Sequence, residues 1–105
     1  KEKQLKIESL GLRLGDFSPQ IGKRFKLKDI DKGVVVVGVK TGSPAFEQGI
    51  RDGDIIIELG QVGVSTIAEV KTQLKDIKSR GRKTVLLLIK NISGLRFVAL
   101  KFIAE

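Results

Sequence analysis

The apolar residues of this chain come in short runs, and this feature constrains its fold more than any other. Two of the longest unbroken apolar runs are residues 34–37 and 85–89, and Gly33 and Gly38 bound the first of them. A membrane-spanning helix needs about 20 apolar residues, so neither run is long enough. Four consecutive valines favour a strand that is buried on both faces. We therefore expect a fold built from short strands, with no transmembrane helix.

Several other segments have the composition of strands that are bounded by turns. The last two are joined through residues 91–94, where an asparagine and a glycine favour a turn between paired strands. The predicted strands are residues 11–17, 54–59, 83–90 and 95–102.

Two short helices are predicted where the dipeptide Ser-Pro occurs. Ser18 and Ser43 are each suited to cap a helix, and Pro19 and Pro44 are suited to its first helical position. Gly49 follows the second segment closely and ends it, so that helix has little more than one turn.

One long amphipathic helix is predicted over residues 66–81. Thr66 and Glu69 have the spacing of a capping box, and Gly81 ends the helix. The apolar residues that recur at helical spacing are Ile67, Val70, Leu74 and Ile77.

These elements predict a single α+β domain over residues 1–105. Strands outnumber helices, so we expect a small, mainly antiparallel sheet or open barrel of five to six strands, with one long helix and one or two short ones. Residues 1–9 are polar, and we expect them to enter the fold only near Leu5 or Ile7.

Composition excludes several classes of function. The chain has no Cys and no His, so it offers no thiol nucleophile, no Ser-His-Asp triad and no imidazole ligand. Asp52 and Asp54 are too sparse for a metal site, so we expect neither a metal nor a cofactor, and we assign Asp54 a role in a turn. The net charge is +8, but the only aromatic residues are five Phe, which disfavours nucleic-acid recognition by base stacking.

Residues 42–64, with the sequence GSPAFEQGIRDGDIIIELGQVGV, resemble the PDZ domain. The order of the predicted elements over residues 7–103 is similar to that of the bacterial Do/HtrA (DegP-like) serine proteases, and most of all to their second, C-terminal PDZ domain. The resemblance implies a non-catalytic module cut from a periplasmic or envelope protease of protein quality control, whose catalytic domain is absent from this chain. It also implies that the module aids assembly of the parent oligomer.

The resemblance also implies a way of binding. PDZ domains bind C-terminal or unfolded peptide segments as an added strand, in a groove between a sheet edge and the long helix. A loop whose backbone N–H groups hold the terminal carboxylate matches Ser9, Leu10, Gly11 and Leu12. The matching groove residues are Arg13 and Leu14 on the strand and Ile67, Lys71 and Leu74 on the helix, with Val70 and Ile77 in the core. The alternative is that these residues, Leu74 above all, belong to the core as well.

Two residues of the loop depart from the family pattern. Ser9 stands where the family has a glycine, and the carboxylate of Glu8 disfavours a second carboxylate nearby unless Lys6 offsets it. The alternative is therefore a structural domain that aids oligomer assembly and has no open groove, with other subunits of the parent protease as its partners. Lys71, Lys75 and Lys78 form a stripe on the predicted helix, which is either a solvated face or a contact for a partner.

Overall fold

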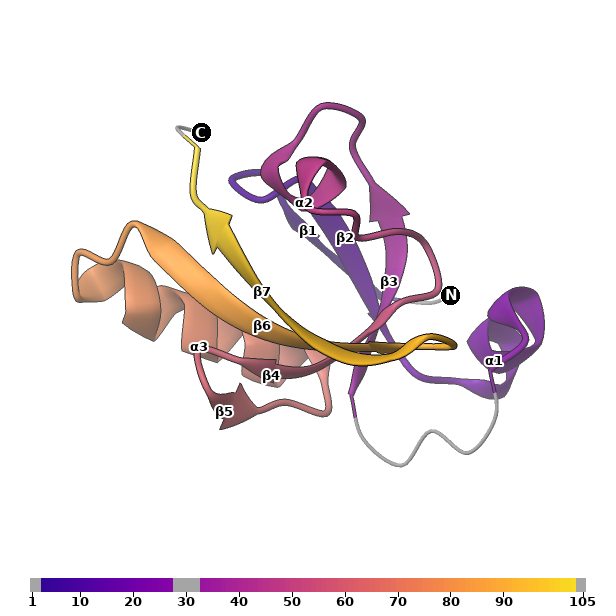
Figure 1. Cartoon of the computed structure of the whole chain (residues 1–105). Helices are drawn as coiled ribbons and strands as arrows, with labels where there is room; N and C mark the ends of the chain where they lie inside the picture. Colours follow the sequence, from indigo (N-terminus) through magenta and orange to yellow (C-terminus); the bar gives the residue numbers. More distant parts are fainter. Residues whose placement is uncertain (1–2, 28–32, 104–105) are drawn as a thin grey trace.

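The computed structural model describes residues 3–27 and 33–103, in which seven strands form one antiparallel sheet and three helices pack around it (Figure 1). The strands are β1 (Gln4–Ile7), β2 (Leu12–Asp16), β3 (Val34–Val39), β4 (Ile55–Leu59), β5 (Val62–Gly63), β6 (Thr84–Asn91) and β7 (Gly94–Lys101). The helices are α1 (Pro19–Phe25), α2 (Pro44–Glu47) and α3 (Ile67–Ser79). The strands lie in the order β1-β2-β3-β4-β6-β7, and β5 pairs with β4. The predicted α+β class is confirmed.

The core has two parts, one on each face of β3. Val34 and Val36 belong to the larger cluster, which the long helix α3 covers with three buried side chains. Val35 and Val37 belong to a smaller cluster with Ile21 of α1. All four valines are at most 2% exposed, as the unbroken run predicted.

The three helices begin where their capping residues predicted. The hydroxyl of Ser18 accepts a hydrogen bond from the Ile21 N–H at 3.2 Å, and the hydroxyl of Ser43 accepts one from the Phe46 N–H at 3.2 Å. Helix α3 starts with a complete capping box between Thr66 and Glu69. Each bond satisfies an N–H group that the helix itself leaves without a partner. None of the described helices is long and apolar enough to cross a membrane.

Two turns also match the prediction. The Arg51 N–H donates to Asp54 Oδ2 at 3.0 Å, so this buried carboxylate holds the turn before β4. The β6–β7 hairpin closes where Asn91 pairs with Gly94, and the Ser93 N–H donates to Asn91 Oδ1 at 2.8 Å.

The structure differs from the prediction at two short strands. Strand β5 has two residues and lies beside β4, and β1 occupies the polar opening segment. Residues of β1 alternate in exposure, since Lys6 is exposed and Ile7 is only 5% exposed. The prediction that the chain enters the fold near Leu5 or Ile7 was therefore close to correct. The sequence did not predict that β1 pairs with β2.

Candidate functional site

The loop between β1 and β2 directs two backbone N–H groups toward one oxygen. The N–H groups of Leu10 and Gly11 donate to the Ile7 carbonyl at 3.2 and 2.8 Å. Two residues outside the turn hold the loop in place. The Ala45 N–H donates to the Leu10 carbonyl at 3.1 Å, and the Lys40 N–H donates to the Gly11 carbonyl at 2.9 Å. The geometry is that of a small oxygen-binding turn held between α2 and the end of β3.

Gly11 is required in this loop for two reasons. Its φ of +78° lies in the left-handed region that side chains disfavour. A Cβ at this position would also overlap the Cβ of Ser43, at the start of α2. A glycine between the buried Leu10 and Leu12 therefore lets the chain turn while both leucines enter the core.

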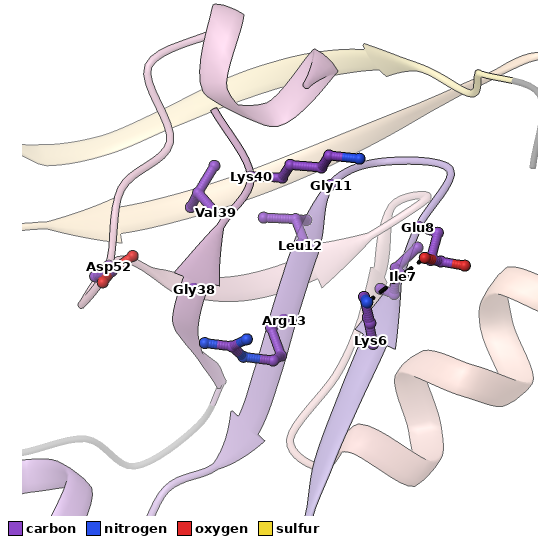
Figure 2. A pocket seen from close by; sticks show the side chains of 10 residues that line it. All are labelled: Lys6, Ile7, Glu8, Gly11, Leu12, Arg13, Gly38, Val39, Lys40 and Asp52. Atoms are coloured by element: carbon purple, nitrogen blue, oxygen red, sulfur yellow. Dashed lines mark ion pairs between the residues drawn. The ribbon is translucent and has the colours of Figure 1, made fainter. Parts of the chain in front are cut away.

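Strand β1 occupies the edge of β2 that faces away from β3. It pairs antiparallel with β2, with Ile7 opposite Leu12 and Lys6 opposite Arg13. It also contacts α3, so it lies in the space between β2 and the long helix (Figure 2). The predicted binding edge, Leu12 to Leu14, is thus paired on both sides in this structure.

The predicted residues of α3 lie in three different environments. Ile67 is half-buried against the core, Lys71 is exposed, and Leu74 is 7% exposed within the core cluster. Val70 and Ile77 are in the core, as predicted. Leu74 therefore acts first as a core residue, and Ile67 and Lys71 are the predicted helix residues that have accessible surface.

Asp16, at the end of β2, ties this strand to α3. Its Oδ1 accepts a hydrogen bond from the Ile67 N–H at 2.7 Å, at the first residue of the helix. This contact sets the separation of the strand and the helix at one end of the groove. Sequence reasoning missed it because the two residues are 51 positions apart; the available signal was an acidic residue at the end of a strand, which suits the free N–H groups of a helix start.

Charged residues surround the loop on two sides. On the outer face of β1, β2 and β3, a hollow of about 410 Å³ is lined by Lys6, Glu8 and Arg13 among others (Figure 2). Lys6 Nζ lies 3.5 Å from Glu8 Oε1, and the Arg13 side chain turns the other way, across Gly38. Lys6 is therefore the cation nearest to Glu8, although both side chains are largely exposed.

The second charged region adjoins the loop at Ser9. A hollow of about 330 Å³ is lined by Ser9, Lys78, Arg82, Lys83 and Phe102, together with two neighbouring residues. The Ser9 side chain is buried and its hydroxyl has no hydrogen-bond partner among the described residues. The described residues contain no group of three acidic, His or Cys side chains that could hold a metal ion.

A model of the PDZ domain family matches residues 19–95, which is most of the chain. The chain belongs to the PDZ domain family. Among curated relatives, the probable periplasmic DegP-like serine endoproteases of Chlamydia muridarum and Chlamydia trachomatis are 33% and 30% identical to it over 95 residues. The matched region is 90% of this chain and 18% of each relative, so the PDZ domain corresponds to a small part of those proteins.

Solved structures confirm the PDZ fold. The HtrA-type protease AlgW with a decapeptide has a TM-score of 0.73 and 18% identity, covering 99% of this chain and 30% of that one. The HtrA3 PDZ domain bound to a phage-derived ligand has a TM-score of 0.64 and 19% identity, covering 100% of this chain and 88% of that one.

Proposed function

We propose that this PDZ domain is a non-catalytic peptide-binding module of a DegP-like serine endoprotease that works in protein quality control in the bacterial periplasm. Its ligands are C-terminal or unfolded peptide segments, which bind as a strand beside β2. The loop from Ser9 to Leu12 holds the terminal carboxylate, and Ile67 and Lys71 face the ligand from α3. Similarity to the DegP-like proteases supports the cellular setting.

One observation carries this proposal. Two N–H groups of the loop already bind a backbone oxygen at the end of a strand that lies along β2. A terminal carboxylate is a stronger acceptor than an amide carbonyl, because charge-assisted hydrogen bonds are about twice as strong as neutral ones. The same turn is therefore suited to a peptide that ends at this point.

An NMR titration tests the proposal. The probes are peptides that end in Val, Leu or Phe, each prepared as the free acid and as the amide. We expect the free acids to shift the backbone signals of Leu10, Gly11 and Ile67, while the amides leave them unchanged. Lys71→Ala is expected to weaken binding about twofold, and Lys75→Ala, one turn further along the exposed face of α3, to leave it unchanged.

The second candidate is a structural domain that aids oligomer assembly with a closed groove. The position of β1 favours it, because β1 pairs with the edge that a ligand strand needs. If neither the acids nor the amides shift the loop signals at millimolar concentration, peptide capture is wrong and the assembly function is preferred.

A further inference from the structure

Strand β1 has the position, direction and side-chain pattern of a ligand in the groove. It runs antiparallel to β2 and ends with the Ile7 carbonyl at the loop. Alternate side chains point to opposite faces of a strand, so Ile7 and Leu5 face inward while Lys6 faces out. Ile7 therefore occupies the position of the last residue of a peptide ligand. Leu5 occupies the position of the ligand's third residue from the end.

We propose that β1 is an intrachain ligand, and that an external C-terminal peptide binds by displacing it. The incoming strand takes over the pairing with β2 and the inward positions of Leu5 and Ile7. This inference rests on the proposed function and adds its regulation: the groove is closed by default and opens in competition with the chain's own strand.

The contacts of β1 are weak enough for exchange. Only Ile7 is fully buried among its four residues, and Leu5 is partly buried. Lys6 is paired with Arg13, whose side chain turns across Gly38, so this pair adds no attraction between β1 and β2. The ion pair of Lys6 with Glu8 joins two side chains that are 71% and 68% exposed, so it adds little.

The loop is held in place by contacts that do not involve β1. The Leu10 carbonyl bonds to Ala45, the Gly11 carbonyl bonds to Lys40, and the Ser9 carbonyl accepts the Ile103 N–H at 3.0 Å. When β1 leaves, these three bonds still hold the backbone of the loop. The two N–H groups that bound the Ile7 carbonyl are then available to a carboxylate.

Charge favours the external ligand over β1. The Ile7 carbonyl is neutral, whereas a peptide that ends here carries a carboxylate. Lys78, Arg82 and Lys83 line the hollow beside Ser9, at the same end of the groove, and raise the local positive potential. Displacement of β1 also takes Lys6 away from Glu8, so an incoming carboxylate meets these three cations and the one carboxylate of Glu8. The free acid keeps a net attraction that the chain's own strand and the corresponding amide lack.

A reversible crosslink tests displacement. The chain has no Cys, so the double variant Lys6→Cys/Arg13→Cys places its only two thiols on opposite, exposed positions of β1 and β2. Facing Cβ atoms in such pairs lie close to the separation that a disulfide needs. The matched control is Lys90→Cys/Leu95→Cys, an exposed opposite pair at the turn of the β6–β7 hairpin.

The probe is a ten-residue peptide that ends in Gln-Leu-Lys-Ile as the free acid, with its amide as reference. We expect oxidation to weaken binding at least tenfold in the β1–β2 variant and to change nothing in the control. Ile7→Ala, which weakens the intrachain strand, is expected to tighten binding about tenfold, because a larger fraction of molecules is open.

The outcomes separate the two proposals. Equal affinity for the oxidised and reduced β1–β2 variant overturns displacement and leaves peptide binding intact. A lack of binding in every form, including Ile7→Ala, overturns the proposed function and the displacement that rests on it.

Discussion

The two edges of β2 differ in how firmly their partner strands are held. On one side β3 contributes four valines that are at most 2% exposed, shared between the two core clusters. On the other side β1 contributes one buried side chain, Ile7, which is 5% exposed. A fully buried aliphatic side chain contributes about 1.5–3 kcal/mol, so β3 is held in the fold several times more strongly than β1. Strand β2 thus has a firmly held partner on one edge and a weakly held partner on the other.

Gly11 directly precedes β2, and its substitution has the largest expected effect. Gly11→Ala places a Cβ against Ser43 in a backbone of positive φ, so we expect it to lower the free energy of unfolding by about 4 kcal/mol. Urea denaturation measures the change. A loss below about 1 kcal/mol would show that the loop adapts and that its geometry is not fixed by α2.

A pair of truncations compares the two edges directly. Val36→Ala is expected to lower the free energy of unfolding by about 3 kcal/mol, as for a fully buried core residue. Ile7→Ala removes more atoms, but the loss is limited to about 1 kcal/mol because β1 can open without global unfolding. Both values come from urea denaturation. If Ile7→Ala costs more than Val36→Ala, β1 is a permanent part of the core.

The contact between β2 and α3 has a smaller effect on stability. Asp16→Ala removes the acceptor of the Ile67 N–H, and we expect a loss of about 1 kcal/mol, typical of a helix-capping contact. Peptide affinity should fall as well, because the strand and the helix are no longer held at this end. Asp76→Ala, which removes an exposed ion pair further along α3, is the control that leaves affinity unchanged.

Arg13 gives the smallest and most specific effect. In the register of the sheet it is paired with Lys6 of β1, which holds the penultimate position of a displacing peptide. A peptide with Glu at that position should bind about threefold more tightly than one with Lys, since opposite charges across strands stabilise pairing. Arg13→Glu should reverse the preference. Isothermal titration with the two peptides measures it, and an unchanged preference in the variant excludes the assigned register.

Local signals in the sequence predicted most of the fold. Ser18, Ser43 and Thr66 are caps whose partners lie three residues away, so their geometry is contained in the adjacent sequence. The valine run of β3 predicted burial on both faces because it shows no alternation. The sequence also indicated that Gly11 lies in a loop, since a glycine does not stabilise the interior of a strand.

The features that depend on distant contacts were not predicted. Strand β1 has only four residues, two of them exposed and polar, which is too short for a periodic signal. The contact of Asp16 with Ile67 joins residues far apart in the chain. For Leu74 the sequence left both a core and a groove position open, because its burial depends on how α3 lies against β1, β2 and β4, which the pattern on the helix alone does not specify.

Native-state hydrogen exchange of β2 tests the difference between its edges most directly. Successive N–H groups of a strand point to opposite neighbours, so the amides of β2 report alternately on β1 and on β3. We predict that the amides facing β1, and those of β1 itself, exchange at least tenfold faster than the amides facing β3, because they open locally. Equal protection on both edges would contradict the account and make β1 a permanent strand of the sheet.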